Sequence, residues 1–267
     1  MENPAAAPPP PPPPPAPAPV PTIITPDPTL EIIALAARYA RAMGPVMGLV
    51  TKLGGKIEKQ MAHLPPSFRK KVESLTGEAL QRALELADKG RNAPDFGPRA
   101  APALAALTGA IGGAGGIASS LAELPVTVTV ILHAILRAAE AEGFDTSLPE
   151  VRAEALRVLA AGGPLDFDDG VDTAFLGARL TLSGPAVHKI LASVVPGFAT
   201  ALSQKLAAQA IPVLGAVTGA ALNTAFLTYY RELAHIRFAL LRLSIQHGAE
   251  AVRMAFEAET EQLKIDR

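Results

Sequence analysis

Three side chains that could do chemistry stand in a row inside an otherwise apolar stretch. Thr129, His133 and Arg137 follow one another at intervals of four residues, so a helix would place them on one face. Glu123 precedes them and could supply a carboxylate to either His133 or Arg137. An acid, an imidazole and a guanidinium in a helical pocket could serve a hydrolase-like enzyme. In a soluble bundle the same residues would be buried polar groups that satisfy one another, and both interpretations stay open.

Other catalytic and metal-binding patterns are incomplete. Glu232 and His235 have the ExxH spacing of a di-iron bundle, but the chain contains no second such pair, so we interpret them as a local polar contact. The acidic run 166–172 lacks the glycine and glutamate positions of a calcium-binding loop. GxSxG, phosphate-loop and GxGxxG patterns do not occur. We therefore predict no metal and no cofactor.

The composition excludes several further classes of protein. The 267 residues carry 24 Lys and Arg against 25 Asp and Glu, a formal net charge of −1, which gives no reason to expect a nucleic-acid partner. The absence of cysteine excludes disulfides, thiolate metal sites and cysteine nucleophiles. Hydrophobic residues make up 49% of the chain, which is high for a soluble protein.

Residues 1–28 form a low-complexity segment rich in proline. Fourteen of the 26 prolines lie there, with an unbroken run at 8–15. Such a run adopts polyproline II and packs no core. Because no basic residue flanks it, we expect a disordered spacer rather than a docking ligand for a proline-binding groove. The first Lys or Arg is Arg38, so the basic region of a secretory signal is missing and we expect a cytoplasmic protein.

Two long uncharged segments give the strongest physical signal. Residues 100–122 and 206–230 contain no charged side chain, and each is long enough to span a bilayer. Both are rich in small residues and contain a GxxxG spacing, which lets helices approach closely. The same residues suit a soluble core and a membrane hairpin, so the choice stays open. The candidate helix-packing residues are Gly112, Gly116, Gly215, Gly219 and Asn223, the last of which would need a hydrogen-bond partner.

A basic region lies near the start of the foldable chain. Residues 38–91 carry 11 basic and 5 acidic side chains. Within it, residues 46–64 are amphipathic, with Lys52, Lys56 and Lys59 on the polar side. A lysine-faced helix of this kind can attach to anionic lipid, and the alternative is an ordinary surface helix.

Helical periodicity and the lack of sustained alternation predict an all-α multi-helix bundle of eight to ten helices, with two Gly/Ala-rich apolar units at its centre. We expect a helix to begin at Asp27-Pro28-Thr29 and another to span 149–161 with a cap at Thr146 or Ser147. Helix ends or breaks are expected at Gly44-Pro45, Pro65-Pro66, Pro125, Gly143, Pro196-Gly197 and Gly248. The domains would be a tail (1–28), a helical domain (29–248) and a charged C-terminal helix (249–267).

Two blocks of sequence resemble the EcsC protein family of bacteria. One begins ELPVTVTVILHAILR at Glu123 and continues through Gly163, and the other reads KLAAQAIPVLGAVTGAALNTAF over 205–226. The resemblance covers roughly 29–248. It implies an all-helical protein without a settled biochemical activity or catalytic residues, linked by its name to protein secretion. At 228–230 and 234–238 this chain reads TYY and AHIRF, where the resemblance implies more polar phrases, so any chemistry shared there is altered.

These observations favour a non-enzymatic accessory or scaffold factor. We expect it in the cytoplasm, peripheral on the inner membrane, with anionic lipid and membrane proteins as partners and a link to transport or secretion. One alternative is a soluble helical enzyme that uses Glu123, His133 and Arg137. The others are a small-molecule or lipid-binding protein and a scaffold recruited through the proline-rich tail.

Overall fold

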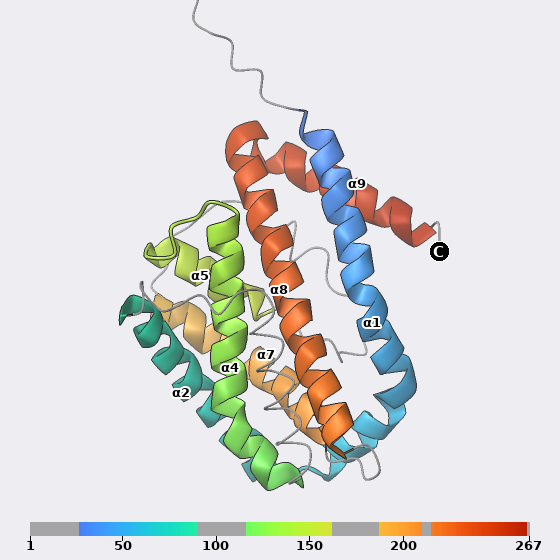
Figure 1. Ribbon diagram of the computed structural model, residues 1–267, viewed down its shortest axis with the longest axis vertical. Helices are drawn as coiled ribbons and strands as arrows, with labels where there is room; N and C mark the ends of the chain where they lie inside the picture. The colour runs from blue at the N-terminus through green and yellow to red at the C-terminus, as the bar shows by residue number, and fades with distance from the viewer. Residues whose placement is uncertain (1–26, 90–115, 162–186, 210–214, 266–267) are drawn as a thin grey trace, which may run out of the picture.

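The computed structural model describes residues 27–89, 116–161, 187–209 and 215–265. Within these ranges the chain forms helices and no strand, so the all-α prediction is confirmed for them (Figure 1). The helices are α1 (Pro28–His63), α2 (Pro66–Lys89), α4 (Gly116–Ala141), α5 (Pro149–Val158), α7 (Val187–Gln209), α8 (Gly215–His247) and α9 (Ala249–Ile265).

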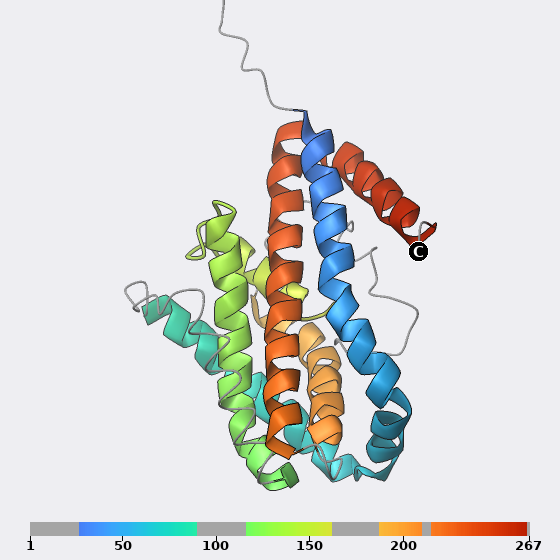
Figure 2. The same cartoon turned by 45° about the vertical axis from the view of Figure 1, so that its right-hand side comes forward.

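Helix α8 is the central element of the bundle. It contacts α1, α4, α5, α7 and α9, while α2 packs against α4 and α7 on the other side of α4. Much of the surface of α8 is apolar and buried, as expected for a helix surrounded by others. Its residues Phe226, Tyr230 and Phe238 are fully buried. Figure 2 shows that α8 runs the length of the bundle, whereas α1 turns away from it toward its own C-terminal end.

Four aromatic residues, Phe198, Phe226, Tyr229 and Tyr230, gather where α7 meets α8, although aromatic residues make up only 4% of the chain. The ring of Tyr230 packs edge-on against Phe198 with centroids 5.4 Å apart and against Tyr229 at 5.0 Å. Such edge-to-face contacts add to the free energy of burial. The Tyr229 hydroxyl donates a 3.4 Å hydrogen bond to the carbonyl of Ala161, so its polar end is also satisfied.

Several predicted helix ends are confirmed. The Asp27 side chain caps α1 by accepting a 2.9 Å hydrogen bond from the backbone N–H of Thr29. Helix α1 ends at His63, just before the prolines that open α2. Gly143 follows α4 and Gly248 separates α8 from α9, with φ of 88° and 90°, the left-handed region that glycine enters at least cost.

Three predicted breaks are wrong, because the helices continue through them. Gly44-Pro45 lies inside α1, Pro125 inside α4 and Pro196-Gly197 inside α7. A proline removes one backbone donor and costs about 3 kcal/mol in a helix interior, which burial of these long helices offsets. In α4 and α7 the hydroxyls of Thr129 and Thr200 donate to the carbonyls of Pro125 and Pro196, at 2.8 and 3.0 Å, a bond typical of bent helices.

The predicted cap of α5 is also wrong. The N-cap is Leu148, which makes no side-chain cap bond, and the helix ends at Val158 rather than 161. Pro149 at the first position needs no donor partner and fixes the helical φ, so no hydroxyl is required there. The carboxylate of Asp145 instead accepts a 2.8 Å hydrogen bond from the N–H of Ser147 within the preceding turn.

The Gly/Ala-rich units are described only in part. Residues 100–115 and 210–214, which belong to the two predicted uncharged segments, lie outside the described residues, as does the tail at 1–26. Among the described residues, the two stretches long and apolar enough to cross a membrane are Leu121–Ala141 and Val187–Ala208 rather than the predicted segments 100–122 and 206–230, and 56% of the most apolar part of each is buried inside the bundle. Their apolar surface therefore already contributes to the protein core. Helix α9 joins the same core through Val252 and Phe256.

Two glycines offer a matched test of backbone conformation. A Cβ would meet nothing within 4 Å at Gly197 or Gly248, but only Gly248 has a positive φ. We expect Gly248→Ala to lower the free energy of unfolding by about 1–2 kcal/mol, because an L side chain is strained there. Gly197→Ala should raise it by about 0.5–1 kcal/mol, because alanine favours the helix. Urea unfolding monitored by circular dichroism measures both, and equal effects would contradict the assigned backbone.

Candidate functional site

The four residues of the predicted polar cluster do not come together. Glu123 lies on the buried face of α4, whereas His133 and Arg137 are exposed. Arg137 is fourteen residues from Glu123, about 21 Å along the helix, and pairs with Glu140 at 2.6 Å. Thr129 bonds to the carbonyl of Pro125. The row at four-residue spacing therefore faces solvent rather than a pocket, and the pairing expected between Glu123 and His133 or Arg137 is wrong.

Glu123 instead forms the centre of a buried network between three helices. Its Oε1 accepts hydrogen bonds from Lys205 Nζ of α7 at 3.2 Å, from Asn223 Nδ2 of α8 at 2.5 Å and from Thr127 Oγ1 of α4 at 2.6 Å. Asn223 thereby obtains the hydrogen-bond partner that a lone amide in an apolar run requires. The Lys205 side chain is only 1% exposed.

Burial sets the electrostatics of this network. It lowers the pKa of Lys205 below its usual 10.5, and the nearby carboxylate of Glu123 opposes that shift. The second oxygen of Glu123, Oε2, is buried without a hydrogen-bond partner among the described residues. When a lysine and a carboxylate are both buried, removal of either one strongly lowers the stability of the fold, because the other charge is left unpaired. We interpret the network as a clamp that holds α4, α7 and α8 together.

Removing one member of the Glu123–Lys205 pair should lower the free energy of unfolding more than removing both. We expect Lys205→Met to lower the free energy of unfolding by about 3–5 kcal/mol, because it leaves the Glu123 carboxylate buried without its cation. The double variant Lys205→Met/Glu123→Leu should recover most of that loss, because no unpaired charge remains. Urea unfolding of the two single variants and the double variant gives the coupling energy, and additive losses would show that the two residues do not interact.

A second buried ion pair joins α5 to α8. Glu154 is fully buried and accepts from Arg237 Nε at 2.6 Å and from Arg157 Nη1 at 2.8 Å. Neither Glu154 nor Arg237 stands out in the sequence, because each lies in a charged stretch that is typical of a solvated helix. Their pairing across 83 residues is a tertiary contact that local spacing cannot reveal.

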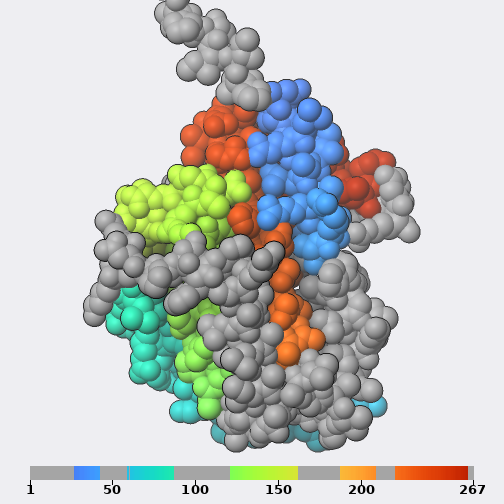
Figure 3. Space-filling model, in the orientation of Figure 1, coloured from blue at the N-terminus to red at the C-terminus, as the bar shows by residue number. Residues whose placement is uncertain are grey.

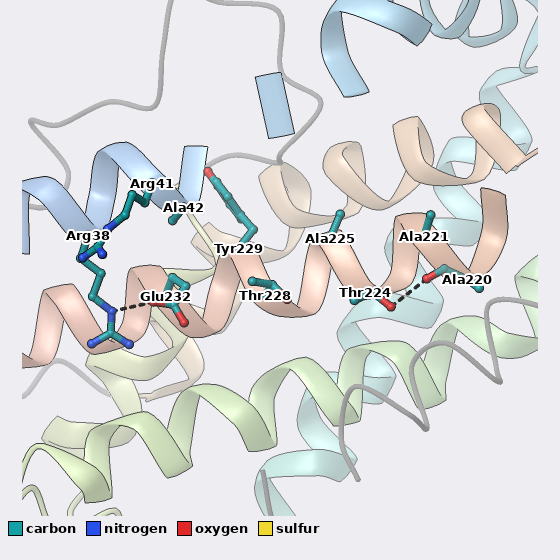
Figure 4. Close-up of a pocket in the computed structure, with 10 residues that line it drawn as sticks. All are labelled: Arg38, Arg41, Ala42, Ala220, Ala221, Thr224, Ala225, Thr228, Tyr229 and Glu232. Carbon is teal, nitrogen blue, oxygen red and sulfur yellow. Dashed lines mark hydrogen bonds and ion pairs between the residues drawn. The ribbon is translucent and has the colours of Figure 1, made fainter. Parts of the chain in front are cut away.

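A groove of about 850 Å³ lies between α1 and α8. Figure 4 shows charged side chains at one end of it and alanines at the other. In the orientation of Figure 3, part of α8 reaches the surface beside α1. The described lining residues are Arg38, Arg41, Ala42, Ala220, Ala221, Thr224, Ala225, Thr228, Tyr229 and Glu232. Thr228 and Tyr229 belong to the triplet TYY at 228–230.

The charged end of the groove has more cations than anions. Glu232 accepts from Arg38 Nε at 2.6 Å and from Arg231 Nη2 at 3.4 Å. Partial burial alone would raise the pKa of Glu232, but the hydrogen bond and charge of Arg38 hold it below the usual value. Arg41 donates through Nε to the carbonyl of Ala37 and has no carboxylate partner among the described residues. Two guanidinium groups, Arg38 and Arg41, thus line this end with one carboxylate, Glu232, and Arg231, which is not among the described lining residues, also pairs with that carboxylate.

Glu232 and His235 interact only through charge, since the charge of His235 helps to lower the pKa of Glu232 but each side chain bonds to a different partner. Glu232 reaches α1, whereas His235 Nδ1 lies 3.3 Å from Glu142 Oε1, just after α4. Arg242 pairs with both Glu31 and Glu142. In the described part of the chain, no three His, Cys, Asp or Glu side chains are grouped as metal ligands. The acidic run 166–172 lies outside the described residues.

The contact with His235 makes Glu142 sensitive to acid. The hydrogen bond with His235 lowers the pKa of Glu142 below 4.5, burial opposes the shift, and the charge of Arg242 adds to it. Because the folded-state pKa lies below the unfolded value, this stabilisation is complete above pH 4.5 and is lost as the pH falls through the lowered value.

We therefore expect Glu142→Gln to be less stable than the parent by about 1–2 kcal/mol at pH 7. The difference should shrink as the pH is lowered from 5 toward 3. Urea unfolding at a series of pH values measures it. Glu85→Gln, at an exposed position on α2, is the control and should change little at any pH. A difference for Glu142→Gln that stays constant with pH would contradict the assignment.

A cluster of exposed cations covers the end of α1 and the start of α2. We call it the basic corner and define it by Lys59, His63, Arg69, Lys70 and Lys71, all of which are exposed. Between Glu58 and Glu73 the chain has four Lys or Arg and no acidic residue. Of the predicted lipid-contacting lysines, Lys59 belongs to this cluster, while the side chains of Lys52 and Lys56 lie outside the described residues.

The structure describes the predicted helix-packing glycines only in part. Gly112 lies outside the described residues. Gly116 begins α4, Gly215 begins α8 and Gly219 follows one turn later, but the surroundings of these three are not part of the described structure. Asn223, the fifth residue of that set, is the buried donor to Glu123.

The fold and its sites define an all-helical bundle stabilised by buried ion pairs, with an open groove and a basic corner. Residues 58–166 match the EcsC protein family, so the family predicted from the sequence is confirmed over this segment. The matched segment includes the whole basic corner and helices α2, α4 and α5. No curated protein and no solved structure matches the chain.

Proposed function

We propose that this EcsC-family protein is a non-enzymatic factor that attaches reversibly to anionic membranes through its basic corner. The observation that carries the proposal is the run of four Lys or Arg without an acidic residue between Glu58 and Glu73. All four of these cations are exposed, and none has a carboxylate partner among the described residues. They are therefore available to lipid phosphates.

Apolar side chains lie among these cations. Met61, Leu64 and Phe68 are partly buried and pack against the protein core while retaining some exposed surface. A mixture of cations and partly exposed apolar groups suits the headgroup region of a bilayer, where both kinds of group find partners. This arrangement supports attachment to the membrane surface.

The burial of the two apolar helices α4 and α7 also favours attachment to the membrane surface. More than half of the apolar stretch in α4 and in α7 is buried within the bundle. The same helices supply Glu123 and Lys205 to the buried clamp. Insertion of either helix would expose an unpaired charge to hydrocarbon, which is costly. This cost favours attachment to the surface over insertion across the bilayer. The cytoplasmic face of the inner membrane, and a role as an accessory to membrane proteins, are part of the proposal.

Co-sedimentation with liposomes tests the proposal. Each Lys or Arg near an anionic surface contributes about 1 kcal/mol, so the triple variant Arg69→Gln/Lys70→Gln/Lys71→Gln should bind anionic vesicles about a hundredfold more weakly. Binding of the parent protein should require anionic lipid and should fall in high salt, because exposed charges are screened.

A control with the same change in net charge separates this surface from a general effect. Arg82, Arg137 and Lys189 are exposed cations elsewhere on the bundle. Their triple substitution by glutamine should leave binding within about threefold of the parent, because charge far from the contact is screened. Equal losses in the two triple variants, or binding that ignores lipid charge, would refute the basic corner as the attachment site. Resistance to carbonate extraction from native membranes would indicate insertion instead.

A further inference from the structure

We propose that the groove between α1 and α8 binds a single-chain anionic amphiphile, an aliphatic carboxylate. This is a binding activity beyond membrane attachment, and it does not depend on the basic corner. The groove uses a different surface, and its ligand would be a single molecule rather than a bilayer. Two features of the groove, an apolar wall and a cationic end, carry the inference.

The wall of the groove is largely apolar, and the hydroxyls of two of its polar residues, Thr224 and Tyr229, are already hydrogen-bonded. Ala42 on α1 and Ala220, Ala221 and Ala225 on α8 present methyl groups. The hydroxyl of Thr224 donates to the Ala220 carbonyl at 2.9 Å.

Tyr229 also lines the groove, and its hydroxyl donates to the Ala161 carbonyl. The ring is therefore the part of this side chain that remains for apolar contact. A ligand lying along this wall would meet few unsatisfied donors or acceptors, so an aliphatic chain is favoured over a polar ligand.

The cationic end selects the head group. Arg38 and Arg231 share the single carboxylate of Glu232, and Arg41 has none among the described residues. Figure 4 places Arg41 beside Arg38 at the end of the groove opposite Ala220 and Ala221. A guanidinium group binds a carboxylate through paired, charge-assisted hydrogen bonds. A ligand carboxylate at this end would balance the surplus positive charge.

The dimensions of the groove favour one chain. The lining residues of α8 extend from Ala220 to Glu232, about 18 Å along the helix axis. A volume of about 850 Å³ lies within the range of small-molecule pockets. An extended aliphatic chain placed along α8 would set its head group near Arg38 and Arg41 and its end near Ala221.

Calorimetry with three monomeric probes tests the proposal. Dodecanoate should bind with one-to-one stoichiometry. Dodecyltrimethylammonium, with the same chain and the opposite charge, should bind at least tenfold more weakly. Acetate should show no saturable binding, because it lacks the chain. Equal affinity for the anionic and cationic amphiphiles, or saturable binding of acetate, would overturn the assignment.

Variants of the groove locate the binding site. Ala225→Trp fills the middle of the wall and should weaken dodecanoate binding at least tenfold. Ala221→Trp, at an exposed position, should also weaken binding with less risk to folding. Arg41→Gln should cost about tenfold, the loss of one charge-assisted contact. Ala258→Trp on the exposed face of α9 is the matched control and should bind as the parent does.

The result can be separated from the test of membrane attachment. The Arg69→Gln/Lys70→Gln/Lys71→Gln variant should lose liposome binding and keep dodecanoate binding. The Ala221→Trp variant should show the reverse. Failure of the parent protein to bind dodecanoate, with its liposome binding intact, would overturn the groove assignment alone. So would unchanged dodecanoate affinity in folded Ala225→Trp and Ala221→Trp proteins.

Discussion

The buried contact between Glu123 and Lys205 is the constraint on which the rest of the bundle depends. It joins α4 to α7, and Asn223 brings α8 to the same oxygen. Apolar packing between alanine-rich helices has little directional preference, because small side chains fit one another in several registers. Buried polar groups with few acceptable partners restrict those registers. We infer that the clamp selects one arrangement of the helices from several arrangements that would bury a similar amount of apolar surface.

The central helix connects this constraint to the surface. Asn223 and Thr224 are neighbours on α8, yet Asn223 faces the clamp and Thr224 lines the groove. Fixing α8 against α4 and α7 therefore fixes the position of the groove wall relative to α1. The ion pair between Arg38 and Glu232 then ties α1 to the same helix near the cationic end. The interior of the bundle thus orients a site that none of the clamp residues touches.

Local chemistry predicted much of the fold, and tertiary contacts decided the rest. Proline and glycine at 65–66, 143 and 248 mark real helix ends, because a cap or a positive φ is a local property. Pro125 and Pro196 do not end their helices, because packing of the whole helix outweighs one missing hydrogen bond. The partner of Glu123 could not be predicted from spacing, since Lys205 is 82 residues away. The groove likewise joins α1 to residues nearly two hundred positions later.

The length of α1 has a consequence for how the protein would be displayed on a membrane. The helix has 36 residues, a contour of about 54 Å. Asp27 caps one end, and the basic corner begins at the other. A molecule resting on its basic corner would raise Asp27 well above the lipid headgroups, several screening lengths from the surface charge. In that orientation, helix α1 would separate its capped N-terminal end from the lipid surface by most of its own length.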